Sequence, residues 1–319
     1  MTSYNASLRA RLMPIGLLLI AMSCIQGGAS LATSLFPAVG PATATSLRLI
    51  MAALILWAIF RPWRWRVARR DWRDLLLYGI AMGSMNFLLY QAINHIPLGI
   101  AVALEFTGPL GVALWSSKSR FDLLWIAIAI AGLAVLLGLD HGNSDHTINL
   151  TGVLCALGAG GCWAAYILFG QRAGEVNGMQ SAVWGITIAA VVIAPIGLVD
   201  IAADAFDLQL LLIALGVAIL STALPYTLEM VALPRLPTQT FGTLMSLEPA
   251  FGALSGLLFL GQALGLLQWL AIGAIMTVVL QSSSAAVATR HASGLPPYVE
   301  PCSPGATVTW QAASPSAVL

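Results

Sequence analysis

Residues 12–33 read LMPIGLLLIAMSCIQGGASLAT, a stretch without any Asp, Glu, Lys or Arg. About 20 predominantly apolar residues are enough for an α-helix to cross the ~30 Å hydrocarbon core of a bilayer. Because lipid offers no hydrogen-bond partners, such a segment must satisfy its own backbone groups, which a helix does and an open strand does not. The stretch therefore predicts a first transmembrane helix.

Similar apolar runs recur along most of the chain. Of its 319 residues, 59% are hydrophobic and only 8% are charged, whereas roughly a quarter of a typical soluble protein is charged. Divided at their polar breaks, the runs predict an all-α integral membrane protein with ten transmembrane helices. The expected bounds are 13–35, 42–60, 75–93, 97–116, 121–139, 150–171, 180–199, 208–230, 237–260 and 264–281.

The distribution of basic residues tests this count, because Lys and Arg gather in cytoplasmic loops. With the N-terminus placed in the cytoplasm, every one of the 14 basic residues except Arg48 falls on the cytoplasmic side. An error in the count would scramble this distribution. We therefore expect ten helices with both termini in the cytoplasm. The densest basic group follows the second helix and comprises Arg61, Arg64, Arg66, Arg69, Arg70 and Arg73.

Two sets of small or rigid residues recur in corresponding helices of the two halves. Helices one and six carry Gly27, Gly28 and Phe36 against Gly160, Gly161 and Phe169. Helices four and nine carry Pro97 and Pro109 against Pro237 and Pro249. Because each half has five helices, the second half enters the membrane from the opposite side. The pattern predicts two inverted repeats, residues 12–139 and 150–281, an architecture typical of secondary transporters with a site at mid-membrane.

The remaining sequence narrows the function. Residues 284–319 are rich in Ser, Ala, Pro and Gly and are predicted to form a disordered cytoplasmic tail. No nucleotide-binding loop and no nucleophile–base constellation occurs, so we expect neither a cofactor nor an enzyme. The net charge of +1 does not favour a nucleic-acid partner. The expected partners are a small-molecule substrate, protons and membrane lipids.

Ionisable side chains inside a bilayer are costly, so each is a candidate for function. Glu105, in LEFTGP (104–109), and Glu248, in SLEPA (246–250), are expected near the middle of the fourth and ninth helices. Each precedes a proline, which frees a backbone carbonyl and indicates a cavity lined by protein or water. The functional interpretation is that the two carboxylates bind a substrate ammonium group and exchange protons. The alternative is permanent pairing with Arg48 as a structural contact.

Other polar groups at depth leave alternatives open. Arg48 is expected to hold a substrate carboxylate, to pair with an acid or to extend toward the outer interface. Glu229 is expected either in an interfacial ion pair with Arg235 or at a binding site. Polar and aromatic side chains at depth either line the substrate site or join helices through hydrogen bonds. They are Gln26, Asn86, Tyr90, Gln91, Trp163, Tyr166 and Tyr226.

Four stretches carry a family resemblance: IQGGASLATSLFP (25–37), PLGIAVALEFTGPL (97–110), LGAGGCWAAYIL (157–168) and AILSTALPYTLEMVALPRLPTQTFGTLMSLEPA (218–250). Over residues 12–283 the chain resembles the EamA branch of the drug/metabolite transporter superfamily, and within it the amino-acid exporters. The resemblance implies an inner-membrane exporter of threonine, homoserine and similar amino acids, driven by the proton gradient. It carries no agreed site residues. The rivals are export of another amino acid, a drug or a purine, and a channel or sensor without coupled turnover.

Overall fold

The computed structural model describes residues 2–65, 67–116, 128, 131–132, 149–177, 179–199, 207–232, 244–245, 247–274 and 276–277. Within these ranges all regular secondary structure is helical. Most of the expected fifth helix, the beginning of the expected ninth helix and the tail 284–319 lie outside the described residues.

Six apolar helical segments of the described residues are long enough to cross a membrane. They correspond to the expected helices one to three and six to eight. Five of them belong to α1 (Thr2–Thr33), α2 (Phe36–Phe60), α3 (Trp72–Ile93), α7 (Leu150–Asn177) and α8 (Met179–Leu198). The sixth joins α9 (Leu208–Ala218), the π-helical turn η5 (Ile219–Ala223) and α10 (Leu224–Ala232). Two short 3-10 turns, η1 (Pro62–Arg64) and η2 (Arg69–Asp71), lie between α2 and α3.

The helix expected over 97–116 is broken into α4 (Leu98–Glu105) and α5 (Thr107–Ser116). Pro109 has no N–H to donate to the carbonyl four residues earlier, which is that of Glu105, and its ring clashes with that carbonyl. The helix is therefore interrupted at Phe106, and Glu105 ends a helix instead of lying in the middle of one.

In the expected ninth helix, the described helix α12 (Glu248–Leu260) begins at the glutamate itself. Pro249 occupies the first turn of α12, where its missing N–H costs no hydrogen bond. The expectation that both glutamates lie near the middle of a continuous helix is thus wrong for the described residues, and for one physical reason. A nearby proline ends or starts a helix beside each carboxylate.

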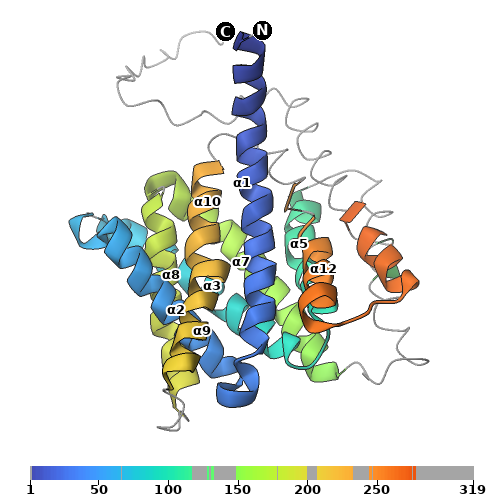
Figure 1. Ribbon diagram of the computed structural model, residues 1–319. Coiled ribbons are helices and arrows are strands. Elements are labelled where there is room, and N and C mark those ends of the chain that lie inside the picture. The colour runs from blue at the N-terminus through green and yellow to red at the C-terminus, as the bar shows by residue number, and fades with distance from the viewer. Residues whose placement is uncertain are drawn as a thin grey trace, which may run out of the picture.

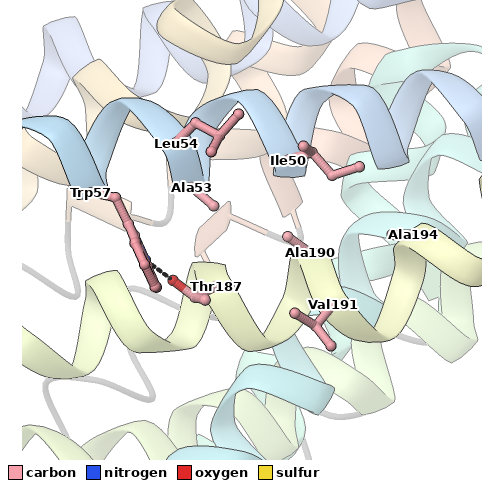
Figure 2. A pocket seen from close by; sticks show the side chains of 8 residues that line it. All are labelled: Ile50, Ala53, Leu54, Trp57, Thr187, Ala190, Val191 and Ala194. Atoms are coloured by element: carbon pink, nitrogen blue, oxygen red, sulfur yellow. Dashed lines mark hydrogen bonds between the residues drawn. The ribbon is translucent and has the colours of Figure 1, made fainter. Parts of the chain in front are cut away.

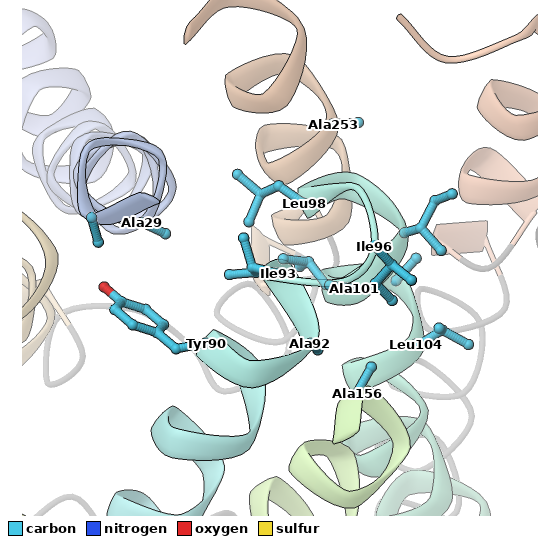
Figure 3. Packing of buried hydrophobic residues seen from close by; sticks show 14 of the residues in the cluster. Ala29, Tyr90, Ala92, Ile93, Ile96, Leu98, Ala101, Leu104, Ala156 and Ala253 are labelled. Atoms are coloured by element: carbon cyan, nitrogen blue, oxygen red, sulfur yellow. The ribbon is translucent and has the colours of Figure 1, made fainter. Parts of the chain in front are cut away.

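The helices form one bundle, and the long helix α1 runs through the middle of the view in Figure 1. α1 contacts α10 and α12, while α2 lies against α8, α3 against α7 and α8, and α4 against α12. Buried apolar residues form one cluster among α1, α3, α4 and α7 and another among α2, α3 and α8. Figure 3 shows the first cluster, in which the Tyr90 ring extends from α3 toward Ala29 of α1.

Large apolar side chains also cover the outside of the bundle. Leu54, Val191, Leu212 and Leu258 are between 59% and 73% exposed. Large exposed apolar surfaces mark interaction sites in proteins that meet water. In a bundle of spanning helices such a surface faces lipid, so the exposed apolar face and the buried core together define a multi-pass membrane protein.

The π-helical turn η5 has a local cause. Pro225 lies two residues after the turn and cannot donate to the carbonyl of Ser221, so the regular ladder of hydrogen bonds cannot continue there. Instead, the backbone N–H of Leu224 donates to the carbonyl of Ile219, five residues earlier. Single π turns of this kind occur frequently at functional sites. Here the turn carries Ser221 and Thr222, both of which are buried.

Glycines allow two backbones to approach closely beside the broken helix. A Cβ atom on Gly160 of α7 would lie 2.6 Å from the carbonyl oxygen of Glu105 and 3.2 Å from the nitrogen of Gly108. A Cβ atom on Gly28 of α1 would lie 2.8 Å from the nitrogen of Ser221. Small residues at helix contacts are typical of membrane proteins. The break after Glu105 and the π turn are therefore both held against a neighbouring helix.

We expect Gly160→Ala to destabilise the protein by about 1–3 kcal/mol, the usual cost of overpacking. The neighbouring substitution Gly161→Ala provides a matched control, because its Cβ would meet nothing within 4 Å. Thermal unfolding in detergent measures both. Equal midpoints for the two variants would show that the contact between α7 and the break after Glu105 does not constrain the fold.

Candidate functional site

Arg48 lies in α2 and is only 4% exposed. Its side chain is enclosed by protein, which favours a contact inside the bundle over extension toward the outer interface. Within the described part of the chain, no carboxylate lies within 4 Å of its guanidinium group. The ion pair recorded among the described residues joins Arg70 and Asp71, which lie after the end of α2. The alternative of a permanent ion pair with a glutamate therefore finds no support among these residues.

Neutral groups from two other elements surround the guanidinium group instead. One terminal nitrogen, Nη1, donates to Ser221 Oγ at 3.2 Å and to Thr222 Oγ1 at 3.4 Å. The other, Nη2, donates to Asn86 Oδ1 of α3. The guanidinium carbon lies 4.6 Å from the centre of the Tyr90 ring, a cation–π contact. We call Arg48, Asn86, Tyr90, Ser221 and Thr222 the arginine cluster.

Three buried polar atoms in this region have no hydrogen-bond partner among the described protein groups. They are Nε of Arg48, the hydroxyl oxygen of Tyr90 and Oε2 of Glu248. Buried polar atoms in proteins almost always have a partner, so each exception needs an explanation. One is a cation donor, one is a hydroxyl and one is a carboxylate oxygen. A donor of the first kind suits a carboxylate group, and a carboxylate oxygen suits an ammonium group.

Glu248 and Glu105 lie at the two helix breaks. Glu248, 7% exposed, accepts a hydrogen bond through Oε1 from Nε2 of Gln26 in α1 at 3.4 Å. Glu105 is 4% exposed, and the charges of both Glu248 and Arg48 act on it. The structure thus brings Glu105 into electrostatic range of both Glu248 and Arg48. Two potential negative charges and one positive charge form the charged part of the candidate site.

Of the two aromatic candidates of α7, Trp163 belongs to the buried cluster around Phe106 and Tyr166 packs against that cluster. Trp163 is buried and its ring meets Phe106, the residue at the helix break, edge to face at 5.3 Å between centroids. Tyr166 stacks on Tyr78 at 5.0 Å. Trp163 therefore packs directly beside Glu105, and Tyr166 packs against the same cluster while it stacks on Tyr78 in a second aromatic group. Neither side chain donates to the arginine cluster.

Glu229 lies at the end of the apolar segment Leu208–Glu229. The residue expected as its partner, Arg235, is outside the described residues. Glu229 acts electrostatically on Tyr78, Tyr166 and Tyr226, the second aromatic group. It also acts on Glu248, and both Glu229 and Arg48 act on Tyr226, so Glu229 is electrostatically linked to the candidate site although no hydrogen bond joins it to the arginine cluster among the described residues. Gln91, also expected at depth, has no role in the cluster either.

Ser221 and Thr222 belong to the site but were not among the residues that the sequence singled out. Both are short hydroxyl side chains in an apolar helix, where such residues usually bond to the backbone of their own helix. Ser221 does so, donating to the carbonyl of Val217 at 2.8 Å. Pro225 was the sequence feature that could have identified them. A proline predicts an irregular turn just before it, and such a turn changes the direction of nearby side chains.

An apolar pocket of about 240 Å³ lies away from these residues, between α2 and α8 (Figure 2). Its lining comprises Ile50, Ala53, Leu54, Trp57, Thr187, Ala190, Val191 and Ala194. The lining surface is apolar, and Leu54 and Val191 at its edge are strongly exposed. It is open on the side that faces lipid and offers nothing to a polar solute.

Spanning helices define a multi-pass membrane protein, and buried ionisable groups beside helix breaks are typical of solute transporters. Residues 150–283 match the model of the EamA-like transporter family. The threonine/homoserine exporter RhtA of Escherichia coli (strain K12) is 53% identical over 271 residues, which cover 85% of this chain and 91% of that protein. The chain belongs to the EamA-like transporter family, and it is a transporter, not an enzyme.

More distant matches agree with this assignment. An uncharacterized transporter of Bacillus subtilis (strain 168), YwfM, is 26% identical, and the match covers 79% of this chain and 89% of that protein. A crystal structure that is 19% identical superposes with a TM-score of 0.54 over 88% of this chain and 98% of the other. At that identity the superposition shows the fold alone.

Proposed function

We propose that this protein exports threonine, homoserine and related small amino acids across the bacterial inner membrane, by proton antiport with alternating access. The substrate class is supported by the relatives named as threonine/homoserine exporters, which match over 91% of their length at 53% identity. The single structural observation that carries the proposal is Arg48, a buried cation with a free Nε donor and no carboxylate partner among the described residues.

The proposed architecture is ten transmembrane helices in two inverted copies, residues 12–139 and 150–281, with both termini in the cytoplasm. The helix contacts support it, because exchanging each helix with its counterpart in the other half maps contacts onto contacts. The contact of α1 with α12 corresponds to that of α7 with α4 and α5, and the contact of α3 with α7 corresponds to that of α1 with α10. The pairs α2 with α8 and α4 with α12 map onto themselves. The tail 284–319 is proposed to be disordered and cytoplasmic.

The substrate carboxylate is proposed to bind Arg48. A fork of donors matches a carboxylate, and the Nε edge remains available while Nη1 and Nη2 are held by the cluster. Asn86 holds the fork in place, since its own amide nitrogen is fixed on the carbonyl of Met82 at 2.8 Å. Tyr90 stacks on the guanidinium group and directs a free hydroxyl to the same region.

The substrate ammonium group is proposed to bind Glu248, and protons to exchange at Glu248 and Glu105. Glu248 offers a free oxygen, and Gln26 fixes its other oxygen. A carboxyl group serves both ligands in turn, because it binds a cation when ionised and carries a proton when neutral. The charge of Glu248 acts on Glu105, so protonation of one carboxyl group affects protonation of the other. Trp163 and Tyr166 are proposed to line the substrate route on the α7 side.

Membrane vesicles containing the protein, loaded with labelled threonine, test the proposed function. We expect a proton gradient directed into the vesicles to accelerate threonine efflux and an uncoupler to abolish the acceleration. Homoserine should compete with threonine. Threonine efflux that is indifferent to the gradient would exclude proton antiport of this substrate. Gradient-driven efflux of another solute in its place would assign that solute as the substrate.

A further inference from the structure

The apolar pocket between α2 and α8, called the groove below, ends beside the basic segment that starts at Arg61. On α2 the lining runs from Ile50 to Trp57, roughly 10 Å at 1.5 Å per residue. That is about two thirds of one leaflet of a bilayer. The backbone N–H of Arg61 donates to the carbonyl of Trp57 at 3.0 Å, so the arginine-bearing segment starts one helical turn beyond the groove.

Tryptophans mark this end of the groove as the level of the lipid headgroups. The Trp57 ring meets Trp63 at 6.2 Å and Trp184 at 6.0 Å, and Trp72 meets Trp184 at 5.1 Å. Trp57 also donates through Nε1 to Thr187 at 2.8 Å, which closes the end of the groove (Figure 2). Tryptophan is enriched where membrane and water meet, because its ring is amphipathic.

The charge at that end is strongly positive. Arg61, Arg64, Arg69 and Arg73 are exposed, and Arg70 pairs with Asp71 at 3.4 Å. The turn η1, which carries Arg64, packs against α8, the second wall of the groove. Among the described residues of this segment, the acidic side chains Asp71 and Asp74 leave a clear excess of positive charge. An apolar groove therefore leads directly to unneutralised arginines.

We propose that this groove and the arginines beside it form a binding site for an anionic phospholipid. One acyl chain lies along Ile50, Leu54 and Val191, and the phosphate group contacts Arg61, Arg64 and Arg69. Positive pockets between helices at the headgroup level select anionic lipids by this combination of a chain groove and a charged end. The site is separate from the arginine cluster, so it does not depend on the substrate proposed above.

The test is a titration of the detergent-solubilised full chain with phosphatidylglycerol or phosphatidylcholine of identical acyl chains, with bound lipid counted by native mass spectrometry. We expect at least about tenfold tighter binding of phosphatidylglycerol. The double variant Arg64→Gln/Arg69→Gln should weaken that binding about 30-fold, since each basic residue at an anionic surface contributes ~1 kcal/mol. Arg172→Gln, at an exposed arginine of α7, should leave it unchanged.

A second variant tests the groove itself. Ala194→Phe fills the groove at its deep end, while Ala58→Phe adds the same ring to an exposed position of α2 outside the lining. We expect Ala194→Phe to displace phosphatidylglycerol and Ala58→Phe to leave it bound. Equal affinity for the two lipids, or equal binding by the two phenylalanine variants, would overturn the proposal. Neither result would bear on threonine efflux, which is measured separately.

Discussion

Arg48→Met is expected to abolish amino-acid export without lowering the stability of the protein. Losing a buried charge-assisted contact to the substrate costs roughly 2–5 kcal/mol, so export should fall about 30-fold or more. Stability should hold because the arginine has no carboxylate partner among the described residues, and removing it strands no opposite charge there. A buried cation is itself costly, and the flexible apolar side chain of methionine replaces the apolar stem of the arginine. Labelled threonine efflux and thermal unfolding measure the two effects.

The combination of results distinguishes function from structure. If Arg48 only joins helices through Asn86, Ser221 and Thr222, the methionine variant should unfold at a clearly lower temperature. Arg48→Lys keeps the charge but loses the planar fork, so it should bind threonine more weakly than the wild type and better than the methionine variant. Wild-type export by Arg48→Met would remove the arginine from the proposed substrate site.

Glu248→Gln is expected to uncouple export from the proton gradient. Glutamine retains the size of the side chain and its contact with Gln26, but it neither ionises nor carries an exchangeable proton. Efflux against a threonine gradient should fall to the level of vesicles without the protein. Exchange of labelled for unlabelled threonine at equal concentrations should persist in part, because that reaction needs no net movement of protons.

Two further substitutions complete this experiment. Glu105→Gln should also impair uphill efflux, because Glu105 senses the charges of Glu248 and Arg48. Asp207→Asn, at the exposed start of α9, changes an acid to its amide outside the site and should have no effect. If both glutamine variants kept uphill efflux at wild-type rates, proton coupling through these carboxyl groups would be wrong.

The sequence was most informative about the helices. Because lipid demands long uncharged segments, the run 12–33 and those like it predicted the positions of six described spanning helices to within a few residues, apart from extensions at some ends. The breaks were harder to place. Hydropathy is continuous across Phe106, and the effect of Pro109 falls four residues before the proline itself. A smoothed pattern therefore predicts one helix where the backbone forms two.

The site could be predicted only residue by residue. Rarity of charge in an apolar helix identified Arg48, Glu105 and Glu248, and depth identified Asn86 and Tyr90. The contact of Arg48 with Ser221 and Thr222 could not be predicted from the sequence. The two hydroxyl residues lie 173 and 174 positions after Arg48, and they meet it only because α2 packs on η5. Ordinary hydroxyl residues carry no local sign of such a contact.

Arg48, which has no carboxylate partner among the described residues, also bears on how the membrane voltage acts during the proposed proton antiport. Threonine and homoserine carry no net charge as zwitterions, so binding one adds nothing to the electrical charge of the site. Export of the amino acid alone is then indifferent to voltage, and each exchanged proton moves one charge, worth about 2.3 kcal/mol per 100 mV. With one proton per substrate, a cell that is negative inside drives the amino acid outward by its electrical potential even where the pH is equal on both sides.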